Sequence, residues 1–394
     1  MGVGIADARR LPALVFGAFI GLVFSCVASA QAFVPTGDDY VLASGTAVTR
    51  ARPDMAFRQA AQLTDSELAE QLAAYLRLAR AEQDLSYIGF GLSLLSRLEP
   101  IRRTNAEIAL AEGDLLQHAH RFPAALEAYR LAAVDPVFVV QAELRRFVLL
   151  MMVGHFGEAR KSCAVLQARA ALGYGLACKT WLAGLTRDTD VAIAELRALL
   201  PLMSDQPAVA GWMREIVLDL LLLNGEIDAA LAMLDSGVLD VADTSQNIAS
   251  PALPVEIVKF TVEHLILAGR YTAARQLLDR AEDARPLSVH RQLLQQLLGR
   301  KAAGRKDTEA LIAGYLRTEQ LDKYKLVALW QLLAESDAPA ALAAAKQSWQ
   351  TNRYISDALL LQQLARTVGD METLAELRRW RQAHSIRSAL LGEV

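Results

Sequence analysis

The chain has 394 residues, of which 53% are hydrophobic and only 6% aromatic, and its formal net charge is −3. It therefore lacks the basic surplus typical of a nucleic-acid-binding protein. Its abundant apolar residues also exclude a globally disordered chain. Much of the apolar content is Ala and Leu, the two apolar residues with the strongest helix propensity, so we expect an all-α protein.

The N-terminus has the pattern of a secretory signal peptide. Arg9 and Arg10 precede an apolar run over residues 11–28, and Ala28 and Ala30 provide the small side chains that a signal peptidase reads. We predict a signal peptide at residues 1–30, with cleavage after Ala30.

Three alternatives remain for this segment. The apolar run approaches the length of a membrane span, so an uncleaved N-terminal tether is possible. The Arg9-Arg10 pair could signal twin-arginine export, although Leu11-Pro12 continues it poorly, and Cys26 could carry a lipid, although Phe24 is bulky for such a site. The favoured prediction is a protein exported to the periplasm or cell envelope, with no stable membrane span after cleavage.

A short motif recurs beyond the signal segment at intervals of about 35 residues, which indicates stacked structural repeats. It consists of a polar residue, an apolar or aromatic residue, two spacers and usually an alanine. It occurs at residues 121–125, 155–159, 190–194, 226–230, 270–274, 337–341 and, more weakly, 370–374. Glycine often precedes it, as a residue that adopts the left-handed conformation at a helix end. We expect the alanine to lie where two helices cross closely.

These units resemble the tetratricopeptide repeat family. In one unit the matching residues are Gly113, Leu116, Phe122, Ala125, Tyr129, Ala132 and Pro136, and in the next they are Phe147, Leu150, Gly154, Phe156, Ala159 and Leu166. The resemblance extends from about Ser66 to Ser385 with decreasing clarity, and so covers most of the chain beyond the predicted signal peptide. It implies a right-handed superhelical solenoid of antiparallel helix pairs, in which each pair buries its apolar face against its neighbours.

The pattern predicts about nine helix pairs. Their ranges are 66–81 with 84–98, 105–119 with 122–134, 138–153 with 156–169, 172–186 with 189–201, 208–224 with 226–236, 254–269 with 271–283, 286–303 with 307–317, 320–335 with 337–350, and 354–368 with 370–384. We divide the chain into a partly irregular lead-in (31–62), an N-terminal lobe of repeats (63–236), an inter-lobe loop (237–254), a C-terminal lobe of repeats (255–385) and a tail (386–394).

The sequence contains no recognisable enzyme motif, so we predict a non-enzymatic protein without a cofactor. The histidines His118, His120 and His155 are close in sequence, but no third ligand is suitably spaced for a metal site. We expect structural or surface roles for them, and for His264, His290 and His384.

Cys163 and Cys178 are the only cysteines that would remain after signal cleavage. They fall on helices predicted to pack side by side, and an exported protein meets an oxidising compartment. We expect a disulfide, which would close a loop of about 15 residues. The alternative is two buried free thiols that pack as small hydrophobic groups.

The resemblance implies a concave face, lined by the first helix of each pair, that holds a peptide or a protein surface. The candidate groove residues are Asp114, Gln117, Met151, Lys179, Trp212, Glu215, Asp219, Lys259 and Glu263. Any one of them could instead belong to an ordinary solvated helix face. We expect an exported scaffold for protein–protein interaction, or alternatively a structural subunit of an envelope or polysaccharide assembly machine.

Overall fold

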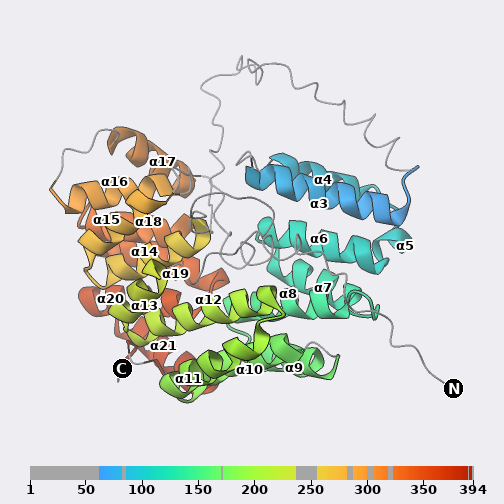
Figure 1. The fold of residues 1–394 in the computed structure, drawn as a ribbon. Coiled ribbons are helices and arrows are strands. Elements are labelled where there is room, and N and C mark those ends of the chain that lie inside the picture. Colours follow the sequence, from blue (N-terminus) through green and yellow to red (C-terminus); the bar gives the residue numbers. More distant parts are fainter. Residues whose placement is uncertain are drawn as a thin grey trace, which may run out of the picture.

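The computed structural model describes residues 62–81, 86–169, 172–236, 255–281, 287–299, 305–317, 323–388 and 390–392. The predicted signal peptide (1–30), nearly all of the lead-in and the loop at 237–254 lie outside this part of the chain. Every regular element within it is a helix, which confirms the all-α prediction (Figure 1). In the N-terminal half the helices are α3 (Asp65–Ala81), α4 (Ser86–Ser96), α5 (Pro100–Arg103), α6 (Ala106–His118), α7 (Phe122–Ala132), α8 (Val139–Met152), α9 (Phe156–Ala168), α10 (Leu172–Thr186), α11 (Thr189–Leu199) and the short 3-10 helix η1 (Leu200–Met203).

The C-terminal half continues the same alternation of helices and short turns. It comprises α12 (Pro207–Asn224), α13 (Ile227–Asp235), α14 (Val255–Leu267), α15 (Tyr271–Arg280), α16 (Ser288–Leu297), α17 (Arg305–Arg317), α18 (Tyr324–Leu333), α19 (Ala338–Thr351), α20 (Ile355–Val368) and α21 (Met371–His384). Most helices begin and end within a few residues of the predicted limits, because the turn residues mark the ends clearly.

The turns inside the pairs are built as the sequence motif predicts. Gly154, Gly225, Gly269 and Gly369 all have a positive φ, between 70° and 82°. A left-handed residue at this point lets the last carbonyls of the first helix find donors in the turn. In the final pair, the Asp370 side chain then accepts a hydrogen bond from the backbone N–H of Thr373 and caps the second helix.

The small alanines lie at helix crossings, with one correction. Ala125, Ala159, Ala230 and Ala274 have no exposed surface. In the α10–α11 pair, however, the buried alanine is Ala192, whereas the predicted Ala194 is exposed. The motif was placed two residues too late there, because Asp188 and not Asp190 caps α11 through the backbone N–H of Val191.

The C-terminal segment returns to pack against the middle of the chain. The backbone N–H of Arg353 donates to the carbonyl of Met152 at 2.8 Å, and that of Arg387 donates to the carbonyl of Leu185 at 2.8 Å. The Ser388 hydroxyl donates to the carbonyl of Leu223 at 2.9 Å. Figure 1 shows α20 and α21 (red) lying close to α10–α12 (green). Two parts of the chain that are far apart in sequence therefore pack against each other.

Candidate functional site: the interior seam

The predicted groove residues lie mostly in the interior of the molecule. Asp114, Gln117, Met151, Trp212, Glu215, Asp219, Lys259 and Glu263 are each 9% exposed or less. Lys179 alone among the nine candidates is exposed. The buried candidates are held by contacts within the chain, and they fall into three groups.

The first group surrounds Asp114 on α6. The Tyr129 hydroxyl lies 2.9 Å from an Asp114 oxygen and 2.8 Å from the Gln117 side-chain oxygen, so the two acceptors share its single hydrogen. Arg145 of α8 donates to the same Asp114 oxygen at 2.6 Å. Asp114 and Gln117 therefore tie α6, α7 and α8 together.

The second group is aromatic and contains Trp212, one of the predicted groove residues. Its ring lies 6.0 Å from Phe147, 6.2 Å from Trp181 and 5.8 Å from Tyr174, measured between ring centroids. These separations are typical of packed aromatic pairs. Met151 is 1% exposed and belongs to the same core.

The third group is a charged cluster formed by α14, α16 and α18. Its centre is Glu263, whose carboxylate lies 3.0 Å from Lys325 Nζ, 3.3 Å from His290 Nε2 and 3.9 Å from Lys259 Nζ. Burial alone would raise the pKa of Glu263, but Lys325, Lys259 and His290 outweigh it and hold the pKa well below its usual range. Glu263 is therefore ionised beside the two lysines Lys325 and Lys259.

Asp219 lies at the edge of this cluster and has a different environment. Trp181 Nε1 donates to Asp219 Oδ2 at 2.8 Å, and the Tyr354 hydroxyl donates to the same oxygen. Burial raises the pKa of Asp219 to about 7, because these two donors and the more distant Lys325 only partly offset the loss of water. Burial also raises the pKa of Glu215, one turn earlier on α12, well above its usual value.

The partners of Glu263 and Asp219 were not identified from the sequence. His290 was expected to be structural or on the surface, while Trp181, Lys325 and Tyr354 were not singled out. The available signal was that charged residues recur on the first helix of successive pairs: Glu215 and Asp219 on α12, Lys259 and Glu263 on α14, and Lys325 on α18. Acidic and basic side chains on neighbouring helices can form ion pairs with one another inside the protein as readily as they can bind a ligand.

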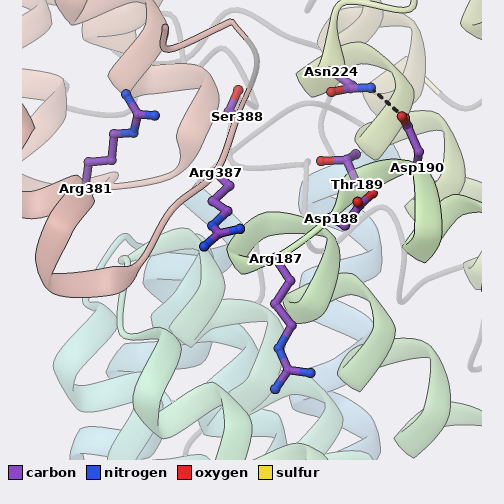
Figure 2. A pocket seen from close by; sticks show the side chains of 8 residues that line it. All are labelled: Arg187, Asp188, Thr189, Asp190, Asn224, Arg381, Arg387 and Ser388. Carbon is purple, nitrogen blue, oxygen red and sulfur yellow. Dashed lines mark hydrogen bonds between the residues drawn. The ribbon is translucent and has the colours of Figure 1, made fainter. Parts of the chain in front are cut away.

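An open pocket of about 470 Å³ lies where the α10–α11 turn and the end of α12 meet α21 and the segment that follows it (Figure 2). Arg187, Arg381 and Arg387 line it together with Asp188 and Asp190. Figure 2 shows the Arg187 and Arg381 side chains pointing away from each other, and Arg381 donates to the backbone carbonyl of Ile386 at 3.2 Å. The arginines do not converge on one point, so the pocket has no anion-binding geometry.

The structure joins Cys163 of α9 to Cys178 of α10 by a disulfide, with the two Cα atoms 5.9 Å apart. This spacing is common for disulfides. Both cysteines are buried at 3% exposure or less. The bond therefore links the second helix of one pair to the first helix of the next.

Two further observations concern the described part of the chain. It contains no group of three His, Cys, Asp or Glu side chains placed to hold a metal ion. None of its helices combines the length and the apolar character needed to cross a membrane. Comparison with protein-family models and with curated proteins finds no match to this sequence.

Proposed function

We propose that the protein is an exported scaffold for protein–protein interaction in the bacterial periplasm or cell envelope. In this proposal its helices form a right-handed superhelical array of about nine tetratricopeptide-type pairs. The proposal draws on the repeated turn motif, the left-handed glycines and the buried crossing alanines. Since most predicted groove residues are buried, the proposed partner binds another surface.

The observation that carries this proposal is a row of exposed apolar side chains, which we term the junction edge. It consists of Ile101, Val134, Val137, Leu172 and Leu202, whose exposed fractions range from 57% to 76%. Each lies where the second helix of one pair connects to the first helix of the next: on α5, between α7 and α8, at the start of α10 and on η1. Because consecutive helices joined by short turns run antiparallel, these connections fall at the same end of successive pairs.

The spacing of the junction edge fits an extended protein segment. Packed helices lie about 8–10 Å apart. An extended chain advances about 3.3 Å per residue, so every third residue could reach the next connection. We therefore propose a partner segment that presents apolar side chains at about this interval, with burial of those side chains as the main source of affinity.

The test is cross-linked capture of the tagged protein from its own cells. We expect a discrete partner that is lost when Val134 and Val137 are both replaced by Asp. A double variant with Val191→Asp and Met371→Asp is the matched control, since these residues are also exposed apolar side chains but lie away from the junction edge. Equal capture by both variants would refute binding at this edge.

The same experiment separates the scaffold from the structural-subunit alternative. A subunit of an envelope or polysaccharide assembly machine should co-purify at fixed stoichiometry without cross-linking, and should do so in both variants. Export is tested by N-terminal sequencing of the mature protein, which we expect to begin at Gln31. A mature chain that still begins at Met1 would favour the uncleaved tether.

A further inference from the structure

The tail packs against α10, α12 and α20 after it leaves α21. The structure describes its residues 386–388 and 390–392. Ile386 and Leu391 are buried, each at 3% exposure. Figure 2 shows Arg387 and Ser388 on the stretch that passes between α21 and the α10–α11 turn. The tail therefore occupies a surface of its own chain, which we term the tail site and define by Leu185, Leu223, Gln362 and Arg381, the helix residues that form hydrogen bonds with the tail.

Most of these hydrogen bonds involve the main chain of the tail. Gln362 of α20 donates from Nε2 to the carbonyl of Leu391 at 2.8 Å, and Arg381 of α21 donates to two further tail carbonyls. The N–H of Arg387 donates to α10, whereas the bond to α12 comes from the Ser388 hydroxyl. Every residue has a main-chain carbonyl, and every residue except proline has an N–H, so another sequence could form most of these bonds.

A pocket of about 450 Å³ adjoins the tail site, and Leu390 of the tail lines it. Much of its wall is apolar, with Leu222 of α12, Leu267 of α14 and Leu359 of α20. Leu390 lies against Gly225 at the end of α12 and is 44% exposed. The volume is the space that this leucine leaves open, so the tail fits the pocket poorly.

An aromatic side chain would fit the pocket better than leucine. Aromatic residues bury more apolar surface than leucine does, and their rings pack well against leucine side chains. Arg366 lies exposed on α20 at the same pocket, and an arginine can stack on the face of an aromatic ring. Hydrogen bonds to the main chain hold a peptide whatever its sequence, whereas side-chain pockets select among sequences.

We propose that the tail site binds a short segment of a partner protein that carries an aromatic side chain where Leu390 lies, and that the tail competes with this segment. The tail is tethered to α21, so its effective concentration at the site is high and it excludes segments that bind weakly. The aromatic side chain supplies the additional affinity that the partner needs.

This site is separate from the junction edge. Leu185 and Leu223 lie at the ends of α10 and α12, next to the turns inside these pairs. The junction edge lies at the connections between pairs, which fall at the other end of antiparallel helices. The proposal therefore does not depend on the scaffold function proposed for the junction edge.

The test uses two fluorescein-labelled peptides and fluorescence polarisation. One has the sequence of residues 385–394, and the other carries Leu390→Trp. The receptor is the full mature chain with Leu391→Asp, which places a charge at a buried position and so releases the tail. We expect the Leu390→Trp peptide to bind about tenfold more tightly than the native sequence, because roughly 55 Å² of additional apolar burial has that effect.

The unaltered chain provides the competition test. Both peptides should bind it at least about tenfold more weakly than they bind the Leu391→Asp protein, because the tail occupies the site. Absence of binding to a Leu391→Asp protein that is folded by circular dichroism would overturn the proposal. Equal affinities of the two peptides would also overturn it, since the site would then suit the tail itself, as in an exchange of tails between two copies.

A second measurement does not require release of the tail. Leu390→Trp in the otherwise unaltered chain should fill the pocket from the tail. It should slow hydrogen exchange of the tail amides by about tenfold, because a more tightly held segment opens less often. Unchanged exchange, measured by mass spectrometry, would show that the pocket does not accept an aromatic side chain at this position.

Two variants, each combined with Leu391→Asp, locate the peptide on the receptor. Leu359→Trp should fill the pocket from α20 and abolish the preference for the Leu390→Trp peptide. Gln362→Ala should weaken both peptides by a similar factor of about five, since it removes one hydrogen bond to the main chain. Lys346→Gln, an exposed change outside the pocket lining, is the matched control and should alter neither affinity. A preference that persists in folded Leu359→Trp would place the aromatic side chain elsewhere and refute the site.

Discussion

The interior of the molecule is held together in two different ways. Between α8 and α12 the contacts are apolar and covalent: the rings of Phe147, Trp181 and Trp212 pack together, and the Cys163–Cys178 disulfide lies next to them. Between α14 and α20 the corresponding interior contains charged side chains. Side chains in both regions are buried, as Asp219 at 1% and Glu263 at 4% exposure show. The difference lies in which protein groups replace water as hydrogen-bond or charge partners.

Two carboxylates show what this difference means for charge. Asp219 lies beside the aromatic region and receives hydrogen bonds from Trp181 and Tyr354, and burial raises its pKa to about 7. Glu263 lies in the charged region beside Lys325 and Lys259, and its pKa is lowered. Burial disfavours ionisation of both groups. Neutral donors offset part of that effect, whereas neighbouring cations reverse it.

The largest expected effect comes from removing a cation of the charged region. Lys325→Met should remove the nearest positive charge from the buried Glu263 carboxylate. The loss should lower the free energy of unfolding by about 3–5 kcal/mol. Urea unfolding followed by circular dichroism measures this change. Lys346→Met is the matched control, because Lys346 pairs with Asp370 on the surface and such pairs contribute about 0–1 kcal/mol. Similar losses of stability in both variants would show that the buried Lys325–Glu263 ion pair contributes no more than the surface Lys346–Asp370 pair.

The second prediction addresses the covalent link of the apolar region. Reduction of the Cys163–Cys178 bond should lower stability by about 3 kcal/mol in the chain-entropy model for a loop of this length. Unfolding with and without reductant measures it, and intact mass after alkylation without reductant should show no added label. A Cys163→Ala, Cys178→Ala double variant should not respond to reductant. Two labelled thiols in the native protein would contradict the bond.

The third prediction concerns helix packing in the apolar region. Ala192→Leu should overpack the α10–α11 crossing, because Ala192 is 1% exposed, and it should lower stability by about 1–3 kcal/mol. Ala194→Leu, two residues later and exposed, should change stability by less than about 0.5 kcal/mol. Thermal unfolding of the two variants compares them directly. The reverse result would restore the alanine position first predicted from the motif.

The sequence predicted the helices well and the closure of the array poorly. Turn residues such as Gly225 and Gly369 act over a few neighbours, so the ends of most helices could be read from local pattern. The return of Tyr354 and Arg387 onto α10 and α12 depends on contacts across much of the chain, and no local pattern reports them. Asp219 was therefore assigned to a concave binding groove, as the family resemblance implied, whereas the structure buries it in the interior. Among the predicted groove residues, Lys179 alone is exposed.

The smallest expected effect is a difference between two pH values of about 1 kcal/mol, and it distinguishes the two regions by the ionisation of Asp219. The folded pKa of Asp219 is raised above its unfolded value, so between about pH 4 and pH 7 the folded protein binds a proton that the unfolded chain has lost. The contribution of Asp219 to the free energy of unfolding is therefore full at low pH and declines as pH rises through this window. Glu263 contributes in the opposite sense, because its lowered pKa gives stability that is present at neutral pH and lost only in acid.

Tyr354→Phe tests this assignment, because it removes one donor to Asp219 and keeps the ring. Above pH 7 the hydroxyl donates to an ionised carboxylate, and its loss should cost about 1.5–3 kcal/mol. At pH 5 the carboxyl is protonated, and the loss should fall to about 0.5–1.5 kcal/mol. Urea unfolding of both proteins at pH 5 and pH 8 measures the difference, which should vanish when Asp219→Asn is also present. A cost that is the same at both pH values would mean that Asp219 is already ionised at pH 5, and that the aromatic region stabilises a buried charge as effectively as the cations around Glu263 do.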